Sequence, residues 1–569
     1  MGLQKTWVIH PILPQTVEQE LQGYPPVLRQ VLYNRGYTTR EAANRYLQAL
    51  PPEGAEPLTM LGMPEAVDRI VFALQKGEAI AVYGDYDADG VTATALLVQF
   101  LRQLGGNVRP YIPNRFDEGY GVNQEALALL HESGIRLIIT VDCGIRSPAE
   151  AAYARELGMD MIISDHHHPG PELPRAHAVI NPKQAGDPYP DKNLAGVGLA
   201  YKMAAALWQH LGQRESVTLA SLQSPEAFLD LVALGTITDL APLVGENRSL
   251  VRSGLLSIRQ PRRQGIAALV GVAGISPANI SAGDVSFMLG PRLNAAGRLE
   301  SALAAYHLLI SDDIHETGQL AQKLENQNRE RQEITRQIQV RAEALAFAED
   351  SDPLLLLAID PEFNPGVVGL VASRLTELHY RPAIVAHQGE EFTRGSCRSI
   401  PEFHITEALD QCADLLEHHG GHASAAGFTV RNQNLGEFIE RLRQVAYDQL
   451  SPLDLRPILT ADMVISLSDL VPEIWDYLAF LQPTGQGNPQ AVFVSQGLRV
   501  LRSRTVGKDN AHLKLTVTDG WITYDAIAFR QGEWQEKLPS TVDLLYTFER
   551  NDYNGRESFQ LNVRDIRPA

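Results

Sequence analysis

The sequence predicts an α/β protein in which a parallel-sheet domain and a second α/β domain are joined by a long helix and followed by a small β-barrel. Three observations predict this arrangement. From residue 79 onward, continuous apolar runs of strand length alternate with amphipathic helical stretches, which is typical of a parallel sheet covered on both faces. Residues 314–347 form a long helical pattern rich in Gln, Glu and Arg. Short, evenly spaced β-rich runs fill the last part of the chain.

The composition is that of a globular, multidomain protein. The chain has 569 residues, of which 44% are hydrophobic and 21% charged, so disorder cannot be its main state. No apolar run approaches the roughly 20 residues of a membrane span, and the N-terminus lacks the apolar segment of a secretory signal. The three cysteines, Cys143, Cys397 and Cys412, are too scattered for a disulfide framework or a thiolate metal site. We therefore expect a cytoplasmic protein without a membrane partner.

The net charge of −19 argues weakly against a protein that coats nucleic acid. It does not exclude a nucleic-acid enzyme. Carboxylates that surround metal ions contribute acid to the total, and a local basic cleft can coexist with an acidic exterior.

In chain order, residues 1–50 read as short helices and loops with proline-rich joints, and residues 51–313 as the first α/β domain. The elements that define this domain are strands at 79–83, 136–141 and 160–164 and helices at 91–104 and 148–157.

Residues 314–350 are predicted to form the connecting helix, either as a linker packed along two domains or as a dimerising coiled coil. A second α/β domain follows at 351–450, and a β domain at 451–569. The predicted strands of the β domain are 491–494, 512–517, 523–529, 542–548 and 559–563.

Acidic residues and histidines come directly after each of the three predicted strands of the first domain. They are Asp85, Asp87 and Asp89 after the first strand, Asp142 after the second, and Asp165, His166, His167 and His168 after the third. Since the carboxyl ends of parallel strands meet at one edge of a sheet, these side chains should converge in one crevice. A fourth acid, Asp239, ends the apolar stretch 228–234 through Gly-Thr-Ile-Thr.

Crowded carboxylates and imidazoles repel one another or compete for protons unless cations lie between them. Oxygen ligands with one or two histidines suit Mn²⁺ or Mg²⁺, including two ions bridged by a shared carboxylate. Such a pair, about 3.5–4 Å apart, polarises a phosphate and activates water, so the spacing predicts phosphoester hydrolysis. Taken singly, the Asp-rich loop could be a calcium-binding turn or a helix cap, and Asp142 an N-cap; their joint placement favours the metal site.

These residues resemble a known family. Asp-His-His after a strand, an Asp at the preceding strand end and an N-terminal Asp-x-Asp-Gly resemble the DHH phosphoesterase superfamily, and 420–427 (Gly-Gly-His-Ala-Ser-Ala-Ala-Gly) resembles its DHH-associated domain. From about residue 50 to the end, the chain resembles the RecJ single-stranded-DNA exonucleases, whose last domain is an OB-like barrel. The matching stretches are 83–90, 194–198, 235–242, 291–298, 366–374, 395–399 and 481–489.

The resemblance implies two divalent metal ions, Mn²⁺ or Mg²⁺. Their ligands would be Asp85, Asp87, Asp89, Asp142, His166 and Asp239, with Asp142 as the bridge. His167 would lie beside the scissile phosphate as a polarising or acid/base group. We expect Asp165 to orient the histidine pair without touching metal, and His168 to be an exposed loop residue.

The resemblance also implies contacts to substrate phosphates. Arg292, Asn294 and Arg298 lie in a stretch predicted to be a Gly/Pro-rich turn, where Arg forks could clamp phosphate, although Arg298 could instead pair with Glu300. Ser396 and Arg398, together with Arg115 and His422, would anchor a 5′-terminal phosphate, so that cleavage starts at the 5′ end. The alternative for 420–427 is a tight turn with a capping histidine.

The OB-like domain would hold single strands by stacking bases on aromatic side chains above basic residues. The candidates are Trp521, Tyr524, Tyr546 and Tyr553 for bases, and Arg502, Arg504, Lys508 and Lys514 for phosphates.

Together these features predict a two-metal, single-strand-specific 5′→3′ exonuclease that releases mononucleotides in DNA recombination and repair. Its substrate would be single-stranded DNA with a 5′ end, and the resemblance implies a single-strand-binding protein and a helicase as partners. Two alternatives stay open. One is a small-substrate DHH phosphoesterase, such as an oligoribonuclease or a bisphosphonucleotide phosphatase. The other is a non-catalytic replication scaffold.

Overall fold

The structure is a computed structural model that describes the chain except residues 1–3, 116–117, 120, 214–220 and 554–555, and the side chains of 552–557. Its backbone contacts divide the chain into two units. The small unit consists of Met1–Val8 and Asn326–Leu459, and the large unit of Ile9–Glu325 and Thr460–Ala569. Each unit is described by itself.

A five-stranded sheet in the large unit confirms the predicted parallel domain. The strands follow the order β3 (Asn107–Tyr111), β2 (Ala79–Tyr83), β4 (Ile135–Val141), β5 (Asp160–Ser164) and β6 (Ala178–Ile180). The two edge strands were not predicted. β3 carries an arginine and a proline, which suit an edge position but break the apolar run, and β6 has only three residues.

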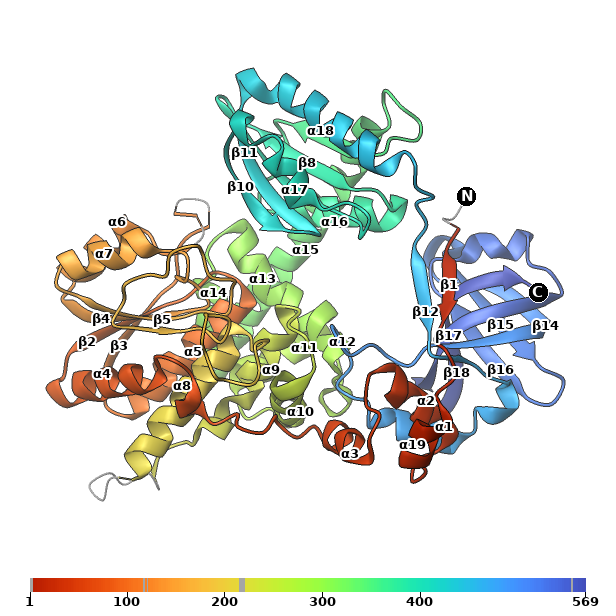
Figure 1. Cartoon of the computed structure of the whole chain (residues 1–569), viewed down its shortest axis with the longest axis horizontal. Helices are drawn as coiled ribbons and strands as arrows, with labels where there is room; N and C mark the ends of the chain where they lie inside the picture. Colours follow the sequence, from red (N-terminus) through yellow and green to blue (C-terminus); the bar gives the residue numbers. More distant parts are fainter. Residues whose placement is uncertain (1–3, 116–117, 120, 214–220, 554–555) are drawn as a thin grey trace. The chain divides into compact units, whose positions relative to one another are not determined.

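Helices cover both faces of this sheet (Figure 1). On one face lie α4 (Met63–Lys76), α5 (Ala88–Gln103) and α8 (Gly196–Gly212), and on the other α6 (Gln124–Glu132) and α7 (Pro148–Glu156). Because successive side chains of a strand point to opposite faces, Ile80 and Val82 join the first core, and Ala81 and Tyr83 the second. The strand is therefore apolar throughout.

A helical region completes the first domain. It comprises α9 (Leu229–Thr238), α10 (Gly245–Arg259), α11 (Gln264–Ala273), α12 (Ala282–Asp284), the π-helical turn η5 (Val285–Leu289), α13 (Gly290–Leu299) and α14 (Leu303–Ile310). The prediction of a turn at 291–298 is wrong, since these residues lie in α13. Pro291 is accommodated in the first helical turn, where an N–H is not needed. Helix α15 (Ile314–Ala346) then carries the chain from the large unit into the small one.

The small unit holds the second predicted α/β domain, a five-stranded sheet in the order β10-β11-β9-β8-β7. Its strands are β7 (Leu356–Asp360), β8 (Ala383–Gln388), β9 (Phe392–Arg398), β10 (Leu416–His422) and β11 (Ala425–Arg431), and its helices α16 (Val368–His379), α17 (Ile405–Asp410) and α18 (Leu435–Leu450). The stretch 420–427 forms the hairpin end of β10 and β11.

The C-terminal region of the large unit forms the predicted β-barrel. Its strands are β14 (Phe493–Val506), β15 (His512–Thr518), β16 (Thr523–Ala528), β18 (Arg556–Pro568) and β17 (Thr541–Tyr553), and pairing of β17 with β14 closes the barrel. A short strand, β13 (Met463–Val464), and helix α19 (Pro472–Ala479) precede it.

The aromatic residues predicted to stack on bases differ in their exposure in the barrel. Tyr546 is 0% exposed in the core, where its hydroxyl lies 2.7 Å from that of Ser495, so its assignment as a stacking residue is wrong. Trp521 is 89% exposed, and Tyr524 is half-buried. The side chain of Tyr553 lies outside the described residues.

The N-terminal residues form β1 (Thr6–Ile9), α1 (Gln15–Glu20), α2 (Pro26–Asn34) and α3 (Arg40–Gln48). Strand β1 was not predicted; it has four residues and pairs with β12 (Ile458–Ala461). Helices α2 and α3 share one apolar core with the barrel. Among the helices that the structure describes, we find none with the length and apolarity to cross a membrane.

Buried Arg248 fastens α10 to the segment that leads into the barrel. Its guanidinium donates hydrogen bonds to the carbonyls of Phe480 (2.8 Å), Leu481 (2.6 Å) and Pro483 (3.2 Å), and lies 4.2 Å from the centroid of the Tyr46 ring. These contacts lie within the large unit and hold α3, α10 and the 480–483 segment together.

Candidate metal centre

The acidic residues and histidines gather where neighbouring strands β2, β4 and β5 end. Asp85, Asp142 and His166 follow closely on these strands, as the parallel order requires. Asp87 is the N-cap of α5, and its carboxylate accepts the N–H groups of residues 89 and 90. Asp239 is the C-cap of α9. A helix end therefore completes a site whose other members come from strand ends.

Three groups of ligand atoms could each hold one metal ion. Within every group the atoms lie within 4.8 Å of one another. The groups are Asp142, His166 and His167; Asp89, His166 and Asp239; and Asp85, Asp87 and Asp142. Asp142 belongs to two groups and has two carboxylate oxygens, so it could bridge two neighbouring ions. His166 also belongs to two groups, but its Nε2 has one lone pair and can ligate only one ion.

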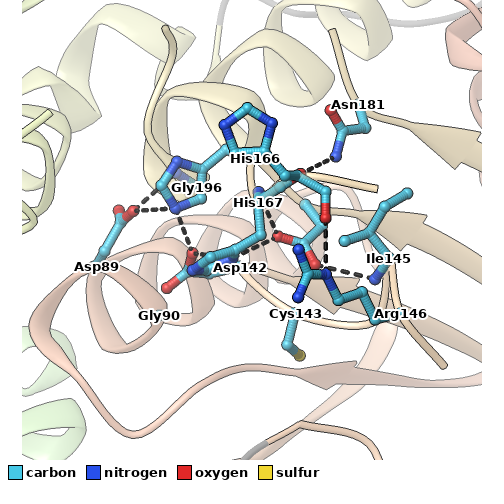
Figure 2. Close-up of polar contacts among 12 residues, drawn as sticks. Asp89, Gly90, Asp142, Cys143, Ile145, Arg146, His166, His167, Asn181 and Gly196 are labelled. Carbon is cyan, nitrogen blue, oxygen red and sulfur yellow. Dashed lines mark hydrogen bonds and ion pairs between the residues drawn. The ribbon is translucent and has the colours of Figure 1, made fainter. Parts of the chain in front are cut away.

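The buried polar atoms of this cluster fit cations. His166 Nε2 lies 3.1 Å from Asp142 Oδ1 and 3.9 Å from an Asp89 oxygen (Figure 2). It also lies 3.8 Å from an Asp239 oxygen. Asp85 Oδ1, Asp142 Oδ1 and His166 Nε2 are buried, and none of the three has a hydrogen-bond partner among the described residues. Orphaned buried acceptors are costly, and divalent ions would satisfy them. The residues therefore fit the two ions that the resemblance implies.

Burial and mutual repulsion disturb the protonation of these groups. Burial, together with Asp87, raises the pKa of Asp89 to about 7 and the pKa of Asp85 well above its usual range. Burial and the charge of Asp89 raise the pKa of Asp239 to about 9 and also raise the pKa of Asp142. Burial lowers the pKa of His166 to about 3, so its imidazole is neutral and suited to metal ligation.

Asp165 orients His167, as expected. Its carboxylate Oδ1 lies 2.8 Å from His167 Nδ1 and accepts the His167 backbone N–H at 3.0 Å, while Oδ2 accepts the N–H of Ile145 at 2.9 Å. Burial alone would lower the pKa of His167, but the hydrogen bond and charge of Asp165 outweigh burial and raise it. His168 is exposed, as expected.

The backbone around Asp142 is tightly fitted. Asp142 has a φ of 64°, in the left-handed region that side chains other than glycine rarely adopt. A Cβ placed on Gly196 would lie 2.6 Å from Asp142 Cβ, so only glycine fits there. Gly196 and Val197, at the first turn of α8, also donate their N–H groups to the Asp89 carboxylate at 2.7 and 2.8 Å. We assigned no role to these two residues from the sequence; a Gly-x-Gly at a helix start was the available signal.

The phosphate-clamp candidates from α13 have other contacts. Arg292 Nε lies 2.7 Å from Glu325 Oε2, and its Nη1 donates to the Met288 carbonyl. Asn294 Oδ1 accepts the N–H of Ala88 at 2.8 Å, which ties α13 to the start of α5. The acid proposed as a partner of Arg298, Glu300, pairs with Lys323 at 2.8 Å. Arg298 itself is half-buried.

Arg115 lies at this metal centre, with its guanidinium 5.2 Å from the centroid of the Tyr86 ring.

In the small unit, Ser396 and Arg398 lie side by side at the start of α16. A Cβ on Gly369 would lie 3.4 Å from Ser396 Oγ and 3.3 Å from Arg398 Nη2. Burial lowers the pKa of Arg398. His422 is an exposed residue of the β10–β11 hairpin.

Comparisons with known proteins agree with this architecture. Three family models match the chain: the DHH family, N-terminal domain at residues 79–236, the DHHA1 domain at 351–448 and the RecJ OB domain at 461–565. The RecJ exonuclease of Bacillus subtilis is 39% identical over 95% of this chain and 68% of its own length. The RecJ exonuclease of Escherichia coli is 36% identical over 96% of both chains.

Solved structures agree as well. The crystal structure of RecJ from Thermus thermophilus in complex with Mn²⁺ matches 99% of this chain and 80% of that chain, with a TM-score of 0.85 and 32% identity. The complex of the same enzyme with Mg²⁺ matches with a TM-score of 0.78 and 29% identity, over 99% of this chain and 78% of that chain. With its three domains, its fold and its sequence all matched, the chain belongs to the RecJ family of single-stranded-DNA-specific exonucleases.

Proposed function

We propose that the protein hydrolyses single-stranded DNA from its 5′ end and releases mononucleotides, using two Mn²⁺ or Mg²⁺ ions. One observation supports the chemistry above all: buried carboxylates and an imidazole converge at the ends of three adjacent strands, and three of their atoms have no hydrogen-bond partner among the described residues. Relatives with 36–39% identity that are named single-stranded-DNA-specific exonucleases support the substrate.

Asp85, Asp87, Asp89, Asp142, His166 and Asp239 are the proposed metal ligands, and Asp142 is the proposed bridge because it belongs to two of the three ligand groups. The chemistry that two such ions supply is polarisation of the phosphodiester and activation of water. The protein contributes a neutral imidazole at His166, and backbone N–H groups at Gly196 and Val197 that fix the Asp89 carboxylate.

His167 is the proposed polarising or acid/base group. Its Nδ1 is held by Asp165, which fixes the ring plane and leaves Nε2 as the nitrogen that would meet the scissile phosphate or the leaving oxygen. The raised pKa favours a protonated imidazole, which can donate a hydrogen bond to an anionic oxygen.

Ser396 and Arg398 are the proposed contacts to a 5′-terminal phosphate. A serine hydroxyl and a half-buried guanidinium beside the start of the twelve-residue helix α16 suit an anion. His422, in the same unit, is proposed to contribute to this contact. In the large unit, Arg115 and Arg298 are proposed to contact phosphates of the strand. Because Arg292 and Asn294 are bonded to Glu325 and Ala88, we propose that they act by holding α13 and α5 in place.

Two further proposals concern the protein's partners and its location; the partners rest on the family alone. A single-strand-binding protein and a helicase that supplies single strands would be the protein partners, in DNA recombination and repair. The three cysteines are free and buried, which supports a reducing, cytoplasmic location.

The test is digestion of 5′- and 3′-labelled single strands and of their duplex, with Mn²⁺, Mg²⁺ or EDTA. We expect metal-dependent release of labelled mononucleotide from the 5′ label, and little from the duplex. A shortening ladder that appears first on the 5′-labelled strand would mean digestion from the 3′ end. A strong preference for a dinucleotide over a long strand would favour the small-substrate phosphoesterase, and binding without cleavage under any metal would favour the scaffold.

A further inference from the structure

Two apolar side chains are exposed beside the metal centre of the large unit. Leu240, which directly follows the proposed ligand Asp239, is 61% exposed, and Phe287 is 81% exposed. Both line one cavity of about 440 Å³, together with residues from the segment 482–490 that leads into the barrel. We propose that this cavity binds a nucleobase of the single-stranded substrate, with Phe287 and Leu240 contacting the base; the inference rests on the proposed function.

Leu240 occupies a position that normally belongs to glycine. Its N–H donates to the Ile237 carbonyl and the N–H of Ala241 donates to that of Thr236, both at 3.2 Å, which is the Schellman arrangement at a helix end. Its φ of 59° is unfavourable for a residue with a side chain. Burial does not compensate for the backbone strain at Leu240, so we infer that its side chain takes part in binding.

Phe287 lies at the centre of the π-helical turn η5. The flanking residues Val285 and Leu289 point into the core, so the turn directs the phenyl ring into solvent. Single π-helical turns are rare and recur at binding sites, because they re-aim side chains. An exposed ring offers the face on which any base can stack.

The remaining lining suits the edge of a base. Gln482 and Gln486 are exposed and carry amides that can both donate and accept hydrogen bonds, while Gln490 is held by Arg564 at 3.0 Å. Such amides adapt to different bases, as an enzyme that degrades strands of any sequence requires. Among the described residues, no acidic side chain that would repel a nucleic acid lines the cavity.

The cavity walls are held in place. The N–H of Leu243 donates to the carbonyl of Gln486 at 2.7 Å, and a Cβ on Gly485 would lie 2.8 Å from Leu243. On the other side, a Cβ on Gly290 would lie 2.7 Å from the Thr238 side chain, so α13 fits closely against the residue before Asp239. Fixed walls reduce the entropy lost when a base is bound. The lining residues Ile237 and Leu240 place the cavity next to the proposed metal ligand Asp239.

The experiment measures dissociation constants of 5′-phosphorylated single strands in EDTA, with one base at a time replaced by an abasic residue. For the intact strand, Phe287→Ala should weaken binding about 10-fold, since a stacked base contributes about 1–3 kcal/mol. At one position near the 5′ end, an abasic residue should weaken binding to the wild type by the same factor. At that position it should not further weaken binding to Phe287→Ala.

Three variants separate binding from folding. Phe287→Tyr keeps an aromatic face and should restore the affinity. Leu240→Gly relieves the backbone strain, so it should raise Tm while it weakens binding, a combination that structural damage cannot produce. Phe72→Ala removes a half-exposed ring on α4, remote from the cavity lining, and should leave the affinity unchanged.

The outcomes are distinct. Additive effects of Phe287→Ala and the abasic residue at every position, in an enzyme that does bind and degrade single strands, would overturn this inference alone. Unchanged DNA affinity with an altered oligomeric state would overturn it in favour of a protein interface. Failure of the wild type to bind single strands would overturn the proposed function and this inference together.

Discussion

His166 Nε2 and Asp142 Oδ1 lie 3.1 Å apart, yet neither atom forms a hydrogen bond with any residue that the structure describes. A buried imidazole and a buried carboxylate are arranged in this way when both direct lone pairs at cations. This relationship leads to the first prediction.

Asp142→Asn should abolish metal-dependent activity while it leaves the metal-free protein at least as stable as the wild type. The amide has the same shape but removes a charge that burial and the neighbouring acids disfavour. We expect a loss of kcat of at least about 10³-fold, and no rise in Tm on addition of Mn²⁺. Asp68→Asn, on the exposed side of α4, is the matched control and should behave as the wild type. A lower Tm for metal-free Asp142→Asn would contradict the role.

Metal binding should release protons near neutral pH. In the metal-free protein the pKa is about 7 for Asp89 and about 9 for Asp239, so both carboxyls bind protons that a cation has to displace. Affinity for Mn²⁺ should therefore rise between about pH 6 and pH 9. Calorimetric titration in two buffers that differ in ionisation enthalpy measures the release, and equal heats in both buffers would refute it.

The same shifts determine how stability depends on pH. Because the folded pKa values lie above that of an unfolded aspartate, the folded metal-free protein binds more protons than the unfolded chain. The free energy of unfolding of the metal-free protein should therefore fall as pH rises from about 4 through 9. Saturating Mn²⁺ keeps Asp89 and Asp239 ionised, so it should remove their contribution to this fall. Thermal melts with EDTA or Mn²⁺ across this range measure it.

Gly196→Ala should weaken metal binding without unfolding the protein. The added methyl would lie 2.6 Å from Asp142 Cβ, which forces the carboxylate or the start of α8 to move. We expect a loss of Mn²⁺ affinity of about 10- to 100-fold. Gly271→Ala in α11 is the control: nothing lies within 4 Å of its Cβ, and it should stabilise the protein by about 0.5–1 kcal/mol. Equal Mn²⁺ affinities of the two variants would argue against the close fit.

Asp165→Asn should change the pH dependence of the reaction as well as its rate. The charge and hydrogen bond of Asp165 keep the pKa of His167 raised against the effect of burial. Without that charge the pKa of His167 falls, so the limb of the pH–rate profile that reports His167 should move to lower pH. We expect kcat to drop about 10- to 100-fold. A uniform loss of rate with an unmoved profile would mean that Asp165 acts only on structure.

Arg398→Ala should remove the preference for a 5′-phosphate. The guanidinium lies with Ser396 at the start of α16, and its loss should raise KM for phosphorylated strands about 10-fold or more and change KM for 5′-hydroxyl strands far less. Arg431→Ala is the control. It removes an exposed arginine that pairs with Glu391 and Glu417 in the same unit. Equal effects of Arg398→Ala on both kinds of strand would locate the terminal phosphate elsewhere.

The sheet that carries the site was predictable because it leaves a strong signal in the sequence. The central residues of β2, β4 and β5 are buried on both faces and mostly apolar, and an acidic residue follows each strand within two positions. Asp239 has a weaker signal, since it caps a helix and does not end a strand; the apolar stretch before it drew attention to it, and the family resemblance implied its ligand role. Its ligand role, like that of the other five, stays a prediction.

Other features depend on tertiary contacts that local patterns do not contain. Pro291 suggested a turn, but it lies in the first turn of α13, where a proline is tolerated. Tyr546 shares one face of β17 with Leu544 and Phe548, and closure of the barrel makes that face its interior. The hydrogen bonds from Gly196 and Val197 to Asp89 join residues far apart in the chain, so no local pattern could predict them.

The shared core of the N-terminal helices and the barrel has a consequence for the order in which the chain can fold. Leu28, Val31 and Tyr46 are made more than 440 residues before their partners Phe493 and Leu544. At typical synthesis rates of about 5–20 residues per second, the interval is on the order of a minute. During that time α2 and α3 expose an apolar surface. Chaperones should therefore bind nascent chains at these two helices, even after the parallel sheet has formed.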